Sequence, residues 1–246
     1  MFKHNFSDEI DDVLNDIIYD IDEESIQNEQ ENKSYDSFAD ITFFFPIADK
    51  LVDPLKKIKL TPNNITCIST VFTFLSIYFL NINNHYYATM SYIFGYILDC
   101  VDGKLARKYN MTSDYGMMLD AVSDTVSNLS IIIFLINKYS IDNKYIYMIL
   151  FMSFMLTIYN GMTEAIKSYE TTGIDNFYEK KLNEIKSEDD IVYHLYMYMM
   201  KIMYKTYKIF FPNYNRERMD KILSYIKEFG PGNYCLFFSS ILMIIK

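Results

Sequence analysis

The segment DCVDGKLARKYNMTSDYGMMLDAVSD, residues 99–124, lies between two apolar runs and decides the predicted fold. Its first half has a helical pattern with offsets 0, 3, 4, 7 and 8, which place residues on one face of an α-helix. These residues are Asp99, Asp102, Gly103, Ala106 and Arg107. The second half has a similar face with offsets 0, 4 and 8, formed by Gly116, Asp120 and Asp124. The polar residues 108–113 predict a turn, so two helices joined there would bring four carboxylates together.

Four carboxylates that face one another near the edge of a membrane need positive charge. They repel one another strongly there, so some of them must take up protons unless cations neutralise them. Oxygen ligands without a His or Cys partner select Mg²⁺ or Mn²⁺, or alternatively Ca²⁺, over zinc and copper. Two such ions can clamp a phosphoanhydride during a displacement reaction. The segment therefore predicts a site for two divalent ions and a phosphate-containing substrate.

Two further residues of the segment suit a nucleotide. Gly103 has no side chain on the carboxylate face, so a nucleotide could lie against the backbone there. Arg107 follows one turn later and could bind a phosphate through its planar set of donors.

This segment resembles the signature of the CDP-alcohol phosphatidyltransferase family, which is D-x-x-D-G-x-x-A-R, eight residues, then G-x-x-x-D-x-x-x-D. Every fixed position of that signature is filled here, and the spacer has the same length. The segment TPNNIT, residues 61–66, is similar to the entry into the family's first membrane helix. The resemblance covers roughly residues 45–165. It implies an all-α, polytopic membrane bundle of six helices with an amphipathic interfacial helix before it.

The resemblance also implies a reaction, in which an alcohol hydroxyl attacks the β-phosphorus of a CDP-linked donor and CMP is released. It implies that one Mg²⁺ or Mn²⁺ ion is held by Asp99, Asp102 and Asp120. Asp120 and Asp124 would complete the second metal site, and Asp124 would be the general base. The residues implied on the nucleotide side are Asn63, Thr66, Gly103, Ala106 and Arg107, while Gly116 would let the helices approach closely. The expected partners are CDP-diacylglycerol, an alcohol acceptor, a lipid membrane and a second copy of the chain, and no nucleic acid is expected.

The identity of the acceptor stays open. The segments 106–110 and 116–120 look like phosphatidylinositol synthases, but Thr125 stands where those enzymes tend to carry Arg. The tripeptide DGK at 102–104 is similar to choline and ethanolamine phosphotransferases, in which diacylglycerol attacks a CDP-linked headgroup. A phosphorylated acceptor would require a basic pocket, to which Lys104, Lys108 and Lys167 could contribute, although surface lysines more often contact lipid headgroups. Glu164 could contact an amine or a hydroxyl group, or it could pair with Lys167.

Negative charge is concentrated at the N-terminus. The chain has 246 residues and a net charge of −9, and residues 1–40 hold 13 of its 32 acidic side chains. That composition predicts a disordered, cytosolic tail over residues 1–40. The other predicted regions are an interfacial amphipathic helix (41–62), a catalytic transmembrane core (63–166), a charged cytosolic or interfacial region (167–230) and a short or partial membrane helix (231–246).

Four membrane spans are expected, at about 65–80, 86–107, 115–136 and 144–166. Lysines before the first span and after the second place that side in the cytosol, because cytosolic loops carry an excess of Lys and Arg. An integral, multi-pass membrane protein with a cytosolic active site is therefore predicted, in the endoplasmic reticulum if the source is eukaryotic. Residues 191–211 carry a polar stripe that favours an interfacial helix. Residues 234–245 are short for a crossing, which needs about 20 residues.

Two other classes of function remain open. The chain could be an inactive family member that acts as a membrane scaffold. It could also be a small cation transporter, because carboxylates inside a membrane mark ion paths as well. The transporter hypothesis does not account for Gly103, Ala106 and Arg107 at their spacings.

Overall fold

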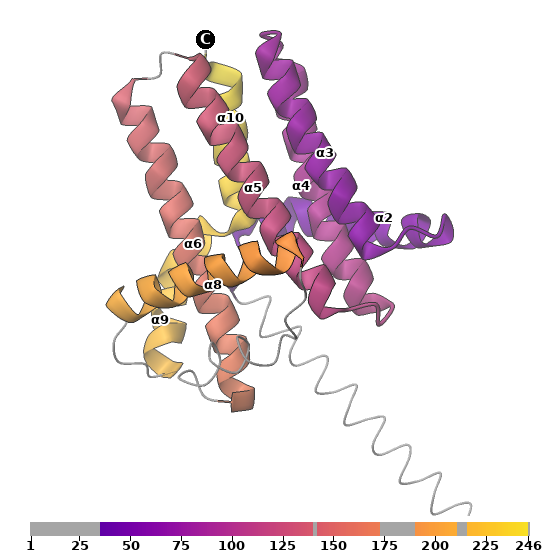
Figure 1. Cartoon of the computed structure of the whole chain (residues 1–246), viewed down its shortest axis with the longest axis vertical. Helices are drawn as coiled ribbons and strands as arrows, with labels where there is room; N and C mark the ends of the chain where they lie inside the picture. Colours follow the sequence, from indigo (N-terminus) through magenta and orange to yellow (C-terminus); the bar gives the residue numbers. More distant parts are fainter. Residues whose placement is uncertain (1–34, 140–141, 173–189, 211–215, 246) are drawn as a thin grey trace, which may run out of the picture. The chain divides into compact units, whose positions relative to one another are not determined.

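The computed structural model describes residues 35–139, 142–172, 190–210 and 216–245 (Figure 1). The chain divides into two units, Met1–Asp36 and Ser37–Lys246, and all of the named helices belong to the second. Every regular element of the described residues is a helix, which confirms the predicted all-α bundle. The second unit begins at Ser37, before the boundary at residue 40 that was expected for the acidic tail. Residues 1–34 of that tail lie outside the described residues.

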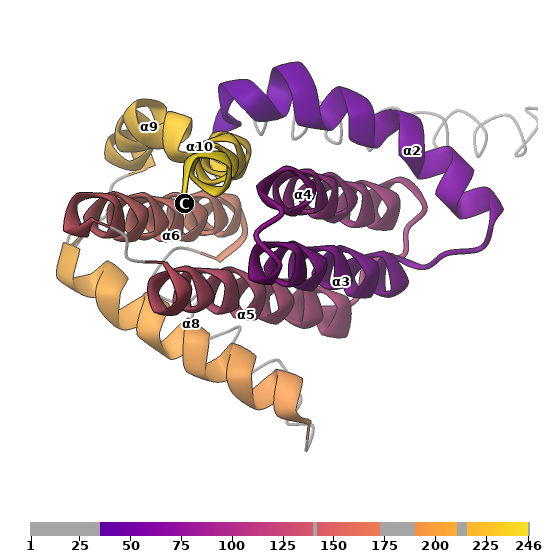
Figure 2. The same cartoon turned by 90° about the horizontal axis from the view of Figure 1, so that it is seen from above.

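The segment before the bundle forms a π-helical turn, η1 (Asp40–Phe44), which continues into α2 (Phe45–Lys57). Helix α2 buries Ala48 and Val52, whereas Lys50 and Lys57 are exposed, as an amphipathic helix requires. It packs against α4 and runs across the direction of the bundle helices (Figure 2). Its location at a membrane interface stays a prediction.

Three consecutive helices form the first half of the bundle: α3 (Pro62–Asn81), α4 (His85–Lys108) and α5 (Asp114–Lys138). The residue before each helix caps it, because its side-chain oxygen accepts a hydrogen bond from a backbone N–H of the first turn. These caps are Thr61, Asn84 and Ser113. Both connecting turns contain an asparagine with positive φ, Asn83 and Asn110, which lets the chain reverse sharply. Short polar segments therefore suffice to connect these helices, and α3 packs against both α4 and α5.

The second half of the chain contains α6 (Asn143–Thr172), α8 (Ile191–Phe210), α9 (Arg216–Ile226), η2 (Lys227–Phe229) and α10 (Pro231–Ile244). Helix α10 packs against α4 and α6, and α9 packs against α6. Helix α8 contacts α5 and crosses the bundle direction instead of running along it (Figures 1 and 2). That orientation suits an interfacial helix over residues 191–211, whose place in a membrane stays a prediction.

Two apolar clusters hold these helices together. One joins η1 to α4, α5 and α10, with Phe44, Leu135 and Phe238 at its centre. The other joins α2 to α3 and α4 through Val52, Ile65 and residues of α4 next to the acidic motif. Because α4 takes part in both clusters, the helix that carries Asp99 is fixed on several sides.

Three of the described helices are long and apolar enough to cross a membrane: Pro62–Asn81, Asp114–Lys138 and Asn143–Thr163. Large apolar side chains such as Val71, Leu129 and Phe151 are exposed on them, as lipid-facing side chains would be. The chain is therefore an integral membrane protein. Helix α4 carries the charges of the motif in its last turns and is not among the three, so its crossing stays a prediction. Helix α10 has 14 residues, which agrees with the short C-terminal element expected from the sequence.

Candidate metal centre

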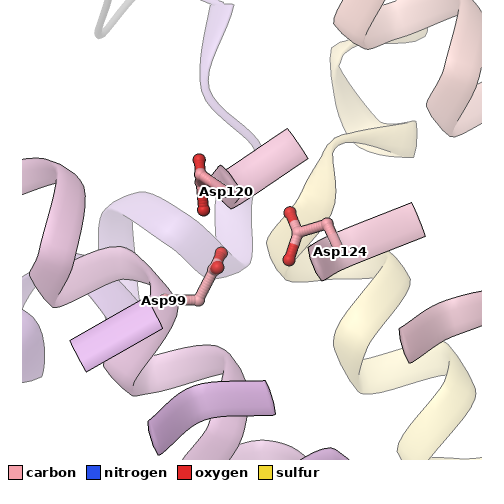
Figure 3. Close-up of side chains that lie close together, drawn as sticks. All are labelled: Asp99, Asp120 and Asp124. Carbon is pink, nitrogen blue, oxygen red and sulfur yellow. The ribbon is translucent and has the colours of Figure 1, made fainter. Parts of the chain in front are cut away.

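Three of the four aspartates of the motif converge between α4 and α5. Asp99 comes from α4, while Asp120 and Asp124 lie one turn apart on α5. Each contributes a carboxylate oxygen to a group in which all of these atoms lie within 4.8 Å of one another. Figure 3 shows the three carboxylates pointing toward a common space between the helices. The two helical faces predicted from residue spacing therefore do meet at these residues.

The protein itself supplies few donors to these carboxylates. One oxygen of Asp99 and one of Asp120 are buried and have no hydrogen-bond partner among the described residues. None of the ion pairs found among the described residues involves these aspartates. Buried polar atoms are normally hydrogen-bonded, and clustered carboxylates repel one another. A divalent cation would remove both problems, and an oxygen-only ligand group is the type that Mg²⁺ and Mn²⁺ prefer.

The fourth aspartate, Asp102, is held differently. Its side chain is buried, with 4% of its surface exposed, and it lies outside the group of three. The Thr66 hydroxyl of α3 donates a hydrogen bond of 2.6 Å to Asp102 Oδ2. The structure therefore brings together three of the four expected metal ligands, and it links the fourth to a residue that was expected on the nucleotide side.

The two glycines of the motif lie against polar side chains. A methyl group at Gly116 would stand 2.9 Å from Asn63 Oδ1 and 3.0 Å from Ser113 Oγ, so the start of α5 approaches the start of α3 closely. A methyl group at Gly103 would stand 3.3 Å from a guanidinium nitrogen of Arg107. Arg107 therefore lies over Gly103, along the last turns of α4.

Sequence reasoning missed the partners of two lysines. Lys104 Nζ lies 2.7 Å from Asp49 Oδ1, and Lys108 Nζ lies 2.6 Å from Asp53 Oδ1, so two ion pairs join α4 to α2. The hydrogen bond from Lys108 holds the pKa of the exposed Asp53 carboxyl below its ordinary value. The matching four-residue spacing of these aspartates and lysines could have indicated the pairing.

A role for Lys104 and Lys108 in a basic pocket for a phosphorylated acceptor stays a prediction. Both ammonium groups are already engaged by carboxylates of α2. Lys167 and Glu164, the other residues considered for acceptor binding, belong to α6, but the structure does not describe their side chains.

Comparison with known proteins agrees with the motif. A family model for CDP-alcohol phosphatidyltransferase matches residues 59–184. The archaetidylinositol phosphate synthase of Pyrococcus horikoshii is 33% identical over 93 residues, which are 35% of this chain and 50% of that protein. The CDP-diacylglycerol–inositol 3-phosphatidyltransferase of Saccharomyces cerevisiae is 38% identical over 79 residues, or 32% of this chain and 35% of that protein.

The enzyme of the same name from Schizosaccharomyces pombe is 26% identical over 113 residues, or 45% of this chain and 47% of that protein. The chain therefore spans about half, or less, of the length of the curated relatives it matches. No solved structure matches it significantly.

Proposed function

The chain belongs to the CDP-alcohol phosphatidyltransferase family, and we propose that it transfers a phosphatidyl group from CDP-diacylglycerol to an alcohol in a metal-dependent reaction that releases CMP. The observation that carries this proposal is the convergence of Asp99, Asp120 and Asp124, two of which have a buried oxygen without a partner among the described residues. The names of the two inositol phosphatidyltransferases and of the archaetidylinositol phosphate synthase support it.

Members of this family depend on divalent metal ions, and Mg²⁺ or Mn²⁺ fits the all-oxygen ligand group. We assign one ion to Asp99, Asp102 and Asp120, and a second to Asp120 and Asp124. When bound, such ions supply positive charge that offsets the charge developing on the diphosphate. Thr66 orients Asp102 through its hydrogen bond, and this contact links α3 to the metal centre.

Asp124 is the proposed general base. It is the most exposed of the three clustered aspartates, so an incoming hydroxyl group can reach it. The acceptor oxygen forms a bond to the β-phosphorus, and the bond from that phosphorus to the bridging oxygen of CMP breaks. CMP leaves with the electron pair of that bond, and the hydroxyl proton passes to Asp124.

The nucleotide would lie beside the metal centre at the starts of α3 and α5 and the end of α4. Arg107, placed over Gly103, carries the positive charge for a phosphate. Asn63 at the start of α3 lies close to Gly116 at the start of α5, and this place suits recognition of a flat base or a ribose. Ala106 and Thr66 complete the residues assigned to nucleotide binding.

An uncharged polyol such as inositol is the acceptor we favour. The relatives' names point to inositol lipids, and the ion pairs of Lys104 and Lys108 leave these two cations engaged instead of free for an acceptor phosphate. The alternative within the family is a choline- or ethanolamine-type transferase, in which diacylglycerol is the acceptor. The proposal also includes a cytosolic active site, a location in the endoplasmic reticulum if the source is eukaryotic, and a homodimer.

The test is CMP release by purified full-length protein in detergent with CDP-diacylglycerol, Mn²⁺ and a panel of alcohols. The panel contains inositol, inositol phosphate, glycerol phosphate and serine, with CDP-choline plus diacylglycerol as the alternative pair. We expect release with inositol and its loss in Asp120→Asn. The matched control is Asp114→Asn, which changes an exposed carboxyl in the first turn of the same helix. Unchanged turnover in Asp120→Asn would refute the proposed metal centre.

A second variant separates binding from chemistry. Asp124→Asn removes the proposed base but keeps the size of the side chain, so the protein should still bind CDP-diacylglycerol while transfer is lost. Binding is measured by displacement of labelled CMP. Equal loss of donor binding and transfer would contradict the assignment of Asp124 as the base.

A further inference from the structure

A second buried carboxylate lies outside the motif. Asp40 in η1 has 2% of its surface exposed, although the sequence places it at the end of an acidic tail. The Ser37 hydroxyl and the Gly232 backbone N–H donate hydrogen bonds to Asp40 Oδ2, at 2.7 and 3.0 Å. The Tyr96 hydroxyl donates a hydrogen bond of 2.7 Å to Asp40 Oδ1. Both oxygens of this carboxylate therefore have partners within the protein.

The first of these connections fixes α10. Gly232 lies in the first turn of that helix, where the unpaired N–H groups and the helix dipole favour a negative charge. Helix α10 has no side-chain cap of its own, and Asp40 supplies one from the opposite end of the sequence. A methyl group at Gly232 would clash with the carboxylate and with the backbone nitrogen of Asp40. Only glycine therefore fits there.

Neighbouring hydrogen bonds connect α10 to the segment around η1 without involving α4. The Asn233 backbone N–H donates to Ser37 Oγ at 3.3 Å, and the Ala39 backbone N–H donates to Asn233 Oδ1 at 3.1 Å. Together with the bond from Gly232 to Asp40, these contacts dock η1 on α10. The hydrogen bond from Tyr96 is therefore an additional connection, which extends from this junction to α4.

Tyr96 stands three residues before Asp99 on α4, so the two side chains leave the helix about 60° apart and one turn from each other. The Tyr96 ring also packs edge-on against Phe44, with ring centres 4.7 Å apart. Fixing the Tyr96 hydroxyl therefore limits both rotation and sliding of α4 at the turn that carries Asp99. A small rotation there would move the Asp99 carboxylate away from Asp120 and Asp124.

We propose that Asp40 is a positioning residue that acts through the Tyr96 hydroxyl to hold Asp99 in register with Asp120 and Asp124. This inference rests on the proposed function. Asp40 and α10 both lie outside residues 59–184, the part that matches the family model. The short C-terminal helix is on this account a support for the metal centre through η1.

The test compares Mn²⁺ binding in full-length wild-type protein, Tyr96→Phe and Asp120→Asn, measured by electron paramagnetic resonance of free Mn²⁺. Tyr96→Phe keeps the ring that packs on Phe44 and removes only the hydroxyl group. Changes behind the ligands of a metal typically cost 10–100-fold in affinity, so we expect a loss of about tenfold. Because Asp40 Oδ1 loses its donor, the melting temperature without metal should fall slightly, so Mn²⁺ binding is measured well below that transition. Tyr86→Phe is the matched control, because Tyr86 is an exposed tyrosine on the same helix.

Each outcome decides the matter. Wild-type Mn²⁺ affinity in Tyr96→Phe overturns the positioning role and leaves the proposed function standing, provided that Asp120→Asn abolishes binding. A loss of affinity in Tyr96→Phe that appears only at temperatures where the metal-free protein begins to unfold overturns it as well, because the hydroxyl would then only stabilise the fold. Wild-type protein without Asp120-dependent Mn²⁺ binding overturns the metal centre and this inference together. Asp40→Asn provides a second test, because it keeps the shape but weakens the acceptor, and it should lower Mn²⁺ affinity in the same direction.

Discussion

Two groups of carboxylates in this chain differ in which partners their oxygens have. Asp40 receives hydrogen bonds on both oxygens from a serine, a tyrosine and a backbone N–H. Asp99 and Asp120 each keep one buried oxygen without a partner among the described residues, and Asp124 adds a third charge beside them. A carboxylate that is satisfied internally holds the fold together. A group of carboxylates that lacks such partners fits the proposed role of binding a cation.

The largest effect is expected from a substitution that breaks the group of three aspartates. Asp99→Asn removes a proposed ligand, and CMP release should fall at least about 100-fold, since even changes behind the ligands can cost that much. The protein without metal should unfold at the wild-type temperature or above it, because one source of charge repulsion is gone. Activity and thermal unfolding with and without a chelator measure both effects. A clear loss of metal-free stability would mean that Asp99 is a structural residue like Asp40.

A substitution at Asp40 should have the opposite effect on the stability of the metal-free protein. Asp40→Ala leaves the Gly232 N–H and the Tyr96 hydroxyl buried without an acceptor, and each such group costs roughly 1–3 kcal/mol. Unfolding in detergent without any metal should therefore occur at a lower temperature, unlike in Asp99→Asn. Ser130→Ala, a change at a half-buried serine of α5, serves as the control. Wild-type stability of Asp40→Ala would remove the structural half of the comparison.

Substitutions at two glycines test the same difference between structural and site residues, with smaller expected effects. At Gly232 a methyl group meets the backbone of Asp40, which cannot move easily, so Gly232→Ala should destabilise the protein by about 1–3 kcal/mol. At Gly116 it meets the side chain of Asn63, which can turn away. Gly116→Ala should therefore keep the stability and raise the KM for the CDP-linked donor. Thermal unfolding and donor titration of the two variants, side by side, would show whether each glycine serves fold or site.

Residue spacing was sufficient to predict the convergence of Asp99 with Asp120 and Asp124. The reason is that a helical face depends only on positions along the chain, and the short polar turn at 108–113 keeps the acidic turns of the two helices close to each other. The helical hairpins followed from equally local signals, the short polar segments between apolar runs.

The rest could not be predicted because it depends on contacts between distant segments. Nothing near Asp40 in the sequence indicates that it meets Gly232, and an acidic residue after an acidic tail is most simply interpreted as part of that tail. Asp102 shares a face with Asp99 in the sequence, but the Thr66 hydroxyl of another helix decides where its carboxylate lies. The ion pairs of Lys104 and Lys108 likewise depend on carboxylates of another helix, α2.

The smallest expected effect concerns a third kind of carboxylate, exposed and paired. Asp53 accepts hydrogen bonds from Lys108 and Tyr109, and the bond from Lys108 lowers its pKa. A carboxyl group with a lowered folded-state pKa adds stability above its ordinary pKa of about 3.9, and that stability is lost as the pH falls through the folded value. Asp53→Asn should therefore lower the unfolding temperature slightly at pH 7 and by less at pH 3, and added salt should reduce the difference. Thermal unfolding of Asp53→Asn and wild type at both pH values measures this. A loss at pH 7 as large as that of Asp40→Ala would show that burial is not what separates the structural carboxylates from the rest.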